Sequence, residues 1–503
     1  LANLLGGVGM SYFTVAYDIY TWMYIITTAG LPVAISRMVS ESNSAGRYED
    51  SKRILNVAFT AFMIFALFCS GLLLIFAEPL AIRMNNREAV YCIVAITPAI
   101  LFEIIMSSNR GFFQGNKDMV PTAMSQIIVA VSKLAFGYIL AYILLKNGIG
   151  MPIAAAGAIF GVTIGGGLGA LYLFIKRLRF KIKPENVFQS NKLTPRRTLL
   201  KQLLSITIPI TIGSSVLSIT NLIDTGMVMN RLTDAGISTE RAKMLFGSYS
   251  ALARTMFNLP TALIIPLGIS VIPAVAEKFA TGLRDKAKGI AESSLRIAII
   301  LSVPAGFGLA FLSEPILNLL FSKRAEEVAI AAPLLTSLGP AVVFVCLVSI
   351  TNSILQSVGK EKVPVFTMII GGVIKLVANY QLVGTPSINI SGAPVGTNLC
   401  YSVITILNLI FIWKALGNMT SLLSATVKTV FASFVSCGGA VLLYRLLENI
   451  VGSKLSTIIS ILITILVYFI ILLLIKGLKE EDISLLPKGE KIKKTLAKYG
   501  WIR

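Results

Sequence analysis

The stretch from Ser248 to Glu277, SYSALARTMFNLPTALIIPLGISVIPAVAE, decides the fold class of this chain. From Thr255 to Ala276 it contains no charged residue, and it is long enough for an α-helix to cross the hydrocarbon core of a bilayer. Arg254 lies near its start, although a charged side chain within a membrane helix is costly. We therefore predict a membrane helix in which Arg254 has a specific role.

The composition of the whole chain also indicates a membrane protein. Of its 503 residues, 55% are hydrophobic and only 14% are charged, and the mean hydropathy is +0.80. The chain contains no histidine, and its five cysteines stand singly in apolar segments. These features exclude histidine-based acid–base catalysis, Ser-His-Asp triads and zinc sites of the usual ligand spacing. We expect no metal centre and no cofactor.

Apolar segments of about 20 residues, the length needed to span a bilayer, recur along the chain. Short polar connectors separate them, and no soluble domain is inserted. We predict an all-α, polytopic membrane protein with thirteen membrane helices. Their approximate positions are 10–38, 54–77, 88–112, 119–145, 151–175, 201–230, 245–275, 288–313, 326–357, 363–384, 390–415, 425–447 and 455–477.

The positive charges predict the orientation in the membrane. The net charge is +21, and Lys and Arg gather in alternate connectors, most densely in KRLRFKIKPENVFQSNKLTPRRTLLK from Lys176 to Lys201. Such connectors remain in the cytoplasm during insertion, so this loop and the C-terminal tail are expected there. Nucleic-acid binding is the weaker interpretation of the charge. The same count places Leu1 outside the cytoplasm, from which we expect a further helix to precede this chain.

An internal repeat organises the chain. GLPVAISRMVSESNSAGRYEDSK and PLGISVIPAVAEKFATGLRDKAK match, with Glu41 corresponding to Glu277 at an offset of 236. Gly46 corresponds to Gly282 at the same offset. A second pair, NRGFFQGNKDMVPTAMSQIIVAVSK and NSILQSVGKEKVPVFTMIIGGVIK, follows in the same order at offsets of 242 and 243. Two parallel halves related by an axis along the membrane normal are an architecture of transporters.

The repeat and the connectors predict five parts of the chain. They are an N-lobe (1–177), a basic cytoplasmic linker (178–200), a C-lobe (201–417), a C-terminal helix pair (418–478) and a basic cytoplasmic tail (479–503).

The repeat also pairs two charged residues inside the predicted helices. Asp18 corresponds to Arg254 at the first repeat offset, so corresponding positions carry opposite charges that could face each other across a central cavity. The guanidinium of Arg254 is a permanently charged fork suited to phosphate. The alternative is that Arg254 extends to the outer interface, which the shorter Asp18 side chain cannot do as far. Arg110 is expected at a cytoplasmic helix end, within reach of headgroups.

Further intramembrane polar residues allow two interpretations. Lys375 and Asn379 are four residues apart and share a helix face. Asp224 could form a structural ion pair with Lys375, or it could exchange between that ammonium and a proton or Na+. Glu103 and Lys133 could pair within the first half.

Several stretches resemble a known family. AGLPVAISRMVSE, RGFFQGNKDMVPTAMSQII, ITNLIDTGMVMNRL and NLPTALIIPLGISVIPAVAE resemble the polysaccharide-biosynthesis and stage V sporulation protein B group. That group belongs to the multidrug/oligosaccharidyl-lipid/polysaccharide exporter superfamily, alongside the MurJ-type lipid II flippases. The similarity runs from residue 1 to about residue 480. It implies two six-helix lobes forming a V plus two C-terminal helices, with the thirteen predicted helices matching the second to the fourteenth of the family.

The resemblance implies roles for individual residues. RTMFNLP matches the pattern Arg-x-Met-x-x-apolar-Pro, so Arg254 resembles a cavity arginine that holds the substrate pyrophosphate. Asp224 resembles a seventh-helix carboxylate. Asn379 and Thr397 resemble polar groups that couple transport to a cation, whereas Lys375 departs from the neutral ligand expected there. The helices at 425–447 and 455–477 resemble the pair that forms a groove for a polyprenyl tail.

The function expected from the resemblance is a flippase of the bacterial cell membrane. It would move undecaprenyl-pyrophosphate-linked sugars, either lipid II or a polysaccharide repeat unit, from the inner to the outer leaflet by alternating access. Arg254, Asp18 and Arg110 are the candidate substrate contacts, and Na+, a proton or the membrane potential would supply the drive. We expect a monomer without enzymatic activity whose partners are this substrate and membrane lipids. The alternatives are a cation-coupled multidrug exporter and a membrane enzyme that polymerises lipid-linked glycans.

Overall fold

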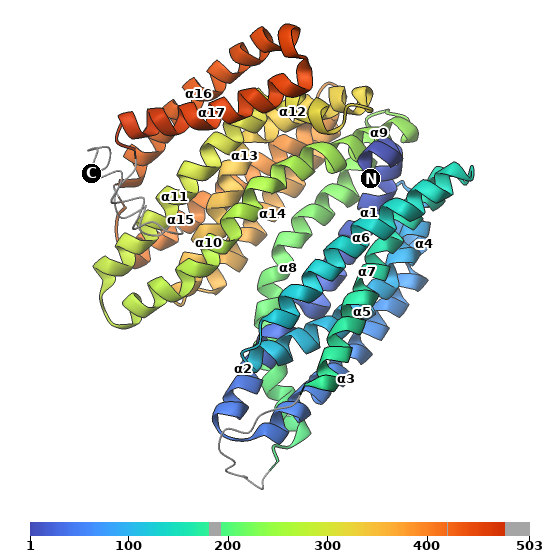
Figure 1. Cartoon of the computed structure of the whole chain (residues 1–503), viewed down its shortest axis with the longest axis vertical. Helices are drawn as coiled ribbons and strands as arrows, with labels where there is room; N and C mark the ends of the chain where they lie inside the picture. The colour runs from blue at the N-terminus through green and yellow to red at the C-terminus, as the bar shows by residue number, and fades with distance from the viewer. Residues whose placement is uncertain (181–192, 420, 478–503) are drawn as a thin grey trace. The chain divides into compact units, whose positions relative to one another are not determined.

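The protein is described by a computed structural model that covers residues 1–180, 193–419 and 421–477 (Figure 1). The described part of the chain consists of helices and connectors, without a β-strand. Among these residues, twelve helical segments are long and apolar enough to cross a membrane. The predicted segment 201–230 lies in a further helix that is not part of this count, because several of its side chains are not described. The prediction of an all-α, multi-pass membrane protein is confirmed.

The chain divides into two compact units. The first unit consists of Leu1–Asn230 and Ser238–Gly247. Its helices are α1 (Ala2–Thr28), α2 (Leu31–Ser44), α3 (Tyr48–Ile75), α4 (Ala77–Arg83), η1 (Arg87–Ala89), α5 (Val90–Gly115), α6 (Val120–Lys146), α7 (Met151–Arg179), most of α8 (Arg196–Asp234) and most of α9 (Thr239–Ser248).

The second unit consists of Arg231–Ile237 and the chain from Ser248 onward. Its helices are η2 (Tyr249–Ala253), α10 (Arg254–Ala280), α11 (Arg284–Phe311), α12 (Ser313–Leu320), α13 (Ala325–Ser357), α14 (Lys362–Val383), η3 (Asn389–Ser391), α15 (Gly392–Leu416), α16 (Ser421–Val451) and α17 (Ser453–Leu474).

The first unit extends further along the chain than the predicted N-lobe, which ended at residue 177. It takes in α8 as far as Asn230, which the sequence analysis assigned to the C-lobe. Hydrogen bonds explain the difference: Asn230 Nδ2 donates to the carbonyl oxygen of Arg83 at 2.8 Å, and Thr225 Oγ1 donates to Asp18 Oδ2 at 2.6 Å. Most of the linker and the basic tail, residues 181–192 and 478–503, lie outside the described residues.

The internal repeat is visible in the helix boundaries. The bounds of α3 and α11 are related by the first repeat offset at both ends, and the same offset relates the starts of α4 and α12. The starts of α6 and α14 are related by the second offset, 242. The turns before α3 and α11 also match, because Gly46 and Gly282 both adopt positive φ, at 71° and 76°. The helix pair α16 and α17 follows the second copy.

Glycine contacts bring helices close together in both units. A Cβ atom on Gly161 of α7 would lie 2.4 Å from the backbone nitrogen of Gly137 in α6. In the second unit, a Cβ atom on Gly306 of α11 would lie 2.6 Å from the carbonyl oxygen of Gly339 in α13. Small residues allow backbone contact between membrane helices, where lipid provides little hydrophobic drive for association. These contacts pack α6 against α7 and α11 against α13.

Candidate functional site

Arg254 begins α10 directly after a π-helical turn. In η2 the backbone follows i→i−5 hydrogen bonding, and the N–H of Arg254 donates to the carbonyl oxygen of Tyr249. The Arg254 side chain is half-buried. Single π-helical turns inside α-helices occur frequently at functional sites, because the extra residue re-aims the side chains that follow. The π-helical turn lies directly before Arg254, whose predicted role in substrate binding stays a prediction.

The opposite face of α10 borders an apolar groove within the second unit. The groove has a volume of about 360 Å³ and is lined by α10, α11, α12 and α17. From α10 it receives Met256, Leu259 and Pro260. At 100° per residue, these three positions lie on the side of the helix away from Arg254. The phenolic oxygen of Tyr468 on α17 donates to the carbonyl oxygen of Ile300 on α11 at 2.7 Å and so closes one end of the apolar wall.

Three predicted coupling residues lie in the packed interface of α14 and α15. Lys375 and Asn379 on α14 are 2% and 0% exposed, and Thr397 on α15 is also buried. Gly396 approaches Asn379 so closely that a Cβ atom would lie 2.2 Å from Asn379 Oδ1. Thr397 Oγ1 donates to the carbonyl oxygen of Ala393 at 3.0 Å. Asn379 therefore packs against α15 at Gly396, the neighbour of Thr397 in the sequence, and Lys375 is buried one turn earlier on α14.

In the first unit, α1 and α8 hold two predicted carboxylates. Asp18 on α1 is buried and accepts the 2.6 Å hydrogen bond from Thr225 on α8. Asp224, the residue before Thr225, is also buried. Sequence reasoning missed Thr225, whose only signal was its place beside Asp224. The predicted partners of these carboxylates, Arg254 and Lys375, belong to the second unit, so both pairings stay predictions.

An aromatic face of α1 leads to a further buried acid. Four rings follow one another along the helix with centroids 5.8, 6.0 and 6.1 Å apart: Phe13, Tyr17, Tyr20 and Tyr24. The hydroxyl of Tyr20 donates to Glu103 Oε1 on α5 at 3.4 Å. Aromatic side chains with polar tips suit such a helix, because their rings pack while their hydroxyls remain hydrogen-bonded.

Arg110 lies on α5 one turn before the helix ends, and it is half-buried. Its Nε donates to Ser125 Oγ on α6 at 2.9 Å, and its Nη2 contacts Met106 Sδ at 3.6 Å. Arg110 is therefore part of the packing between α5 and α6, and its contact with a headgroup or substrate stays a prediction. The predicted pairing of Glu103 with Lys133 also stays a prediction.

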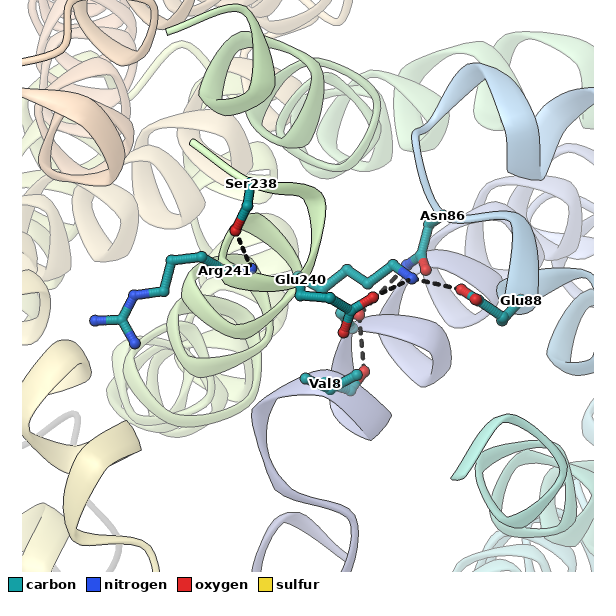
Figure 2. Close-up of polar contacts among 8 residues, drawn as sticks. Val8, Asn86, Glu88, Ser238, Glu240 and Arg241 are labelled. Atoms are coloured by element: carbon teal, nitrogen blue, oxygen red, sulfur yellow. Dashed lines mark hydrogen bonds and ion pairs between the residues drawn. The ribbon is translucent and has the colours of Figure 1, made fainter. Parts of the chain in front are cut away.

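A buried lysine that sequence analysis missed fastens α9 within the first unit. Lys243 Nζ donates to Glu88 Oε2 at 2.5 Å and to Glu240 Oε1 at 3.3 Å. Figure 2 shows Glu88 and Glu240 directed towards the same point, with Asn86 close by. Asn86 Nδ2 donates to Ser11 Oγ on α1 at 3.4 Å. The partner Glu88 lies 155 residues away in the sequence, so only the spacing from Glu240 hinted at this cluster.

Comparisons with known proteins agree with this architecture. A family model described as "Polysaccharide biosynthesis protein" matches residues 1–279, and the MatE model matches residues 247–381. The chain is 27% identical to the lipid II flippase MurJ of Bacillus subtilis (strain 168) over 429 residues, which is 82% of this chain and 78% of that protein. It is 25% identical to stage V sporulation protein B of the same strain over 498 residues, covering 97% and 93% of the two chains.

Solved structures show the same fold. The structure of a lipid II flippase MurJ in an inward closed conformation matches with a TM-score of 0.69 and 17% identity, covering 93% of this chain and 94% of that one. An inward-facing MATE-family multidrug resistance transporter matches with a TM-score of 0.67 and 16% identity, covering 82% and 92%. The predicted MATE/MurJ-like fold is confirmed.

Proposed function

The chain belongs to the polysaccharide biosynthesis protein family, and we propose that it is a membrane flippase for undecaprenyl-pyrophosphate-linked sugars. It moves lipid II or a polysaccharide repeat unit from the inner to the outer leaflet by alternating access. The similarity to proteins named lipid II flippase MurJ and stage V sporulation protein B supports this assignment, because it extends over most of both chains.

The observation that carries the proposal is the two-sidedness of α10. One face of this helix begins with Arg254 after the π-helical turn, and the opposite face borders the apolar groove. A lipid-linked sugar needs both environments, a cation for its diphosphate and an apolar surface for its prenyl chain. The arginine fork binds phosphate oxygens through two parallel hydrogen bonds. The groove, walled in part by α17, accepts a more distant part of the prenyl chain.

Transport of this substrate needs a driving force. We assign it to the membrane potential or to a counter-ion, since one charge crossing a potential of about 100 mV contributes about 2.3 kcal/mol. Lys375 occupies the face of α14 that also bears Asn379, so its ammonium takes the place of a bound Na+ at this interface. We propose that the carboxylate of Asp224 responds to protonation. Asp18 on α1 is held in place by the hydrogen bond from Thr225.

Substitution of Arg254 tests the proposal. Arg254→Ala should lower translocation of a fluorescent lipid-linked diphosphate sugar in proteoliposomes by about tenfold to hundredfold, as expected for the loss of a charge-assisted hydrogen bond. The matched control is Lys278→Ala at the other end of α10, where the ammonium bonds to its neighbour Glu277 at 2.7 Å. This control should retain wild-type translocation. Unchanged translocation by a correctly folded Arg254→Ala protein would refute the assigned role.

Export of amphipathic drugs is the second candidate function. The MatE model match to residues 247–381 and the shared fold favour it. It predicts that expression raises the resistance of a sensitive strain to cationic drugs, whereas a dedicated flippase leaves resistance unchanged.

A membrane enzyme that polymerises glycans is the candidate of another class. The purified protein incubated with a lipid-linked glycan should then give a new covalent product by mass spectrometry, and our proposal expects none.

The proposal also covers the membrane, the oligomeric state and the partners of the protein. It acts as a monomer in the bacterial cell membrane, with membrane lipids and the lipid-linked oligosaccharide as its partners. The basic connectors and the C-terminal tail face the cytoplasm, following the distribution of Lys and Arg. Nucleic acid is not a partner, since the positive charge lies between membrane segments.

A further inference from the structure

A second cavity in the first unit differs in character from the apolar groove. It has a volume of about 750 Å³ and lies between the first turns of α3 and the start of α8. We call it the basic cleft, because its charged lining residues are four cations, Lys52, Arg53, Arg196 and Arg197, and one acid, Glu49. The lining therefore has a net charge of +3 (four positive and one negative). Its size is that of an ordinary small-molecule site.

The acids near the cleft are already engaged. Asp50 is buried, and its two oxygens accept hydrogen bonds from the backbone nitrogen of Thr194 at 3.1 Å and from Thr194 Oγ1 at 2.6 Å. This carboxylate thus ties the chain before α8 to the start of α3. Glu49 lies 3.4 Å from Lys52, and both side chains are exposed. Arg53, Arg196 and Arg197 keep their positive charge within the cleft.

Backbone electrostatics add to this excess. Both α3 and α8 begin at the cleft. The first turn of α3 carries Glu49 and Asp50, which offset its dipole. An acidic residue in the first turn is the usual way to offset a helix dipole. The first turn of α8 contains no acid and begins with Arg196 and Arg197. Two arginines at a helix N-terminus are unfavourable unless an anion binds beside them.

Two observations on Arg53 and Arg177 strengthen the case for an anion ligand. Nε of Arg53 is buried and has no hydrogen-bond partner within residues 1–180, 193–419 and 421–477. A buried donor left unsatisfied costs free energy that a bound phosphate oxygen would recover. Arg177 on α7 donates from Nη2 to Oδ1 of Asn56, which lines the cleft, at 3.0 Å. A fifth cation therefore lies beside the cleft wall.

We infer that the basic cleft binds the phosphate group of an anionic phospholipid from the cytoplasmic leaflet. Along α3 the wall changes from charged to apolar, with Val57 and Ala61 following Arg53 on the same face. The face continues with Ile64 and Phe68, each 63% exposed. A soluble phosphate would use only the charged end, whereas a phospholipid matches both ends. Basic pockets at the cytoplasmic side of membrane helices have this preference.

The bound lipid joins the start of α8 to α3. It neutralises the arginines at the first turn of α8 and supplements the hydrogen bonds between Asp50 and Thr194. The site is independent of the transported substrate, because neither Arg254 nor the groove beside α17 takes part in it. Its test therefore needs no transport assay, and failure of the flippase proposal would leave it standing.

The test counts bound lipid on the full chain. The purified protein in phosphatidylcholine bilayer discs is titrated with phosphatidylglycerol, and native mass spectrometry counts the retained phosphatidylglycerol molecules. Arg196→Gln/Arg197→Gln, a pair exposed at the helix start, should weaken binding about fivefold for each cation removed. Arg53→Gln, which removes one cation, should weaken phosphatidylglycerol binding by at least about fivefold. The matched control is Lys201→Gln, an exposed cation on α8 outside the cleft, and it should bind as wild type does.

Two outcomes would overturn the inference. The first is equal phosphatidylglycerol retention by wild type and by the Arg196→Gln/Arg197→Gln protein, whose thermal unfolding verifies that it folds. The second comes from a separate arm with millimolar inorganic phosphate in phosphatidylcholine alone. If free phosphate raises the unfolding temperature of wild type but not of the double variant, the ligand is a soluble anion and the assignment to a lipid is wrong. An unchanged unfolding temperature in that arm supports the lipid.

Discussion

The equivalent helices α3 and α11 differ in the surroundings of their arginines: one lines a cleft, and the other is buried beside an acid of its own helix. Their bounds are related by the same offset of 236 at both ends, so they are copies of one element. In α3, Arg53 faces the basic cleft. In α11, Arg296 is 1% exposed and is among the largest fully buried side chains. By the repeat offset, Arg296 corresponds to Thr60 and not to Arg53.

The two copies also differ in where the countercharge comes from. Arg296 Nη1 lies 3.6 Å from Glu292 Oε2, and its Nη2 donates to Ser293 Oγ at 2.8 Å. At the position of Glu292, α3 has Asn56. The second unit therefore supplies the anion from within the helix, whereas the first unit leaves its cations to an external one. The two copies therefore share their helix boundaries and differ in their electrostatics.

The largest expected effect concerns the internal pair. Arg296→Ala should lower the free energy of unfolding by about 3–5 kcal/mol, because it deprives the largely buried Glu292 of this cation. Equilibrium unfolding in mixed micelles measures this change.

The control for that prediction removes both charges. Arg296→Met/Glu292→Leu replaces the pair by apolar side chains of similar size, which is often neutral when the original pair is buried. Its free energy of unfolding should return to within about 1 kcal/mol of wild type. A double variant as unstable as Arg296→Ala would mean that Arg296 contributes mainly through packing.

Sequence alone predicted most of the fold, because apolar length and charge in the connectors are local properties. It also predicted a role for Arg254, whose place near a helix start stands out without any partner, and that role stays a prediction. It missed Lys243, since the partner Glu88 becomes its neighbour only when α9 packs against η1. It missed Arg296 as well. Glu292 and Arg296 are four residues apart near a helix start, a pattern that usually indicates an exposed pair.

A second comparison contrasts α1 with α10, which carry opposite charges at corresponding positions. Asp18 on α1 is held by Thr225, so we expect its charge to be fixed in place. Thr225→Val keeps the shape and removes the donor, which should lower the free energy of unfolding by about 2 kcal/mol. The matched control is Thr21→Val, because the hydroxyl of Thr21 bonds to the carbonyl oxygen of Tyr17 within the same helix at 2.8 Å. Equal effects of the two substitutions would contradict a special role for the Asp18 contact.

The last prediction concerns Arg53 in the basic cleft. Its substitution should affect stability far less than that of Arg296. Arg53→Ala in phosphatidylcholine micelles should change the free energy of unfolding by less than about 0.5 kcal/mol, the range of ordinary surface substitutions. The reason is that its removal strands no carboxylate among the described lining residues and relieves repulsion from Arg196 and Arg197. With phosphatidylglycerol added, wild type should gain stability that Arg53→Ala does not. A loss as large as that of Arg296→Ala without anionic lipid would show that both copies use internal partners, and the contrast between them would fail.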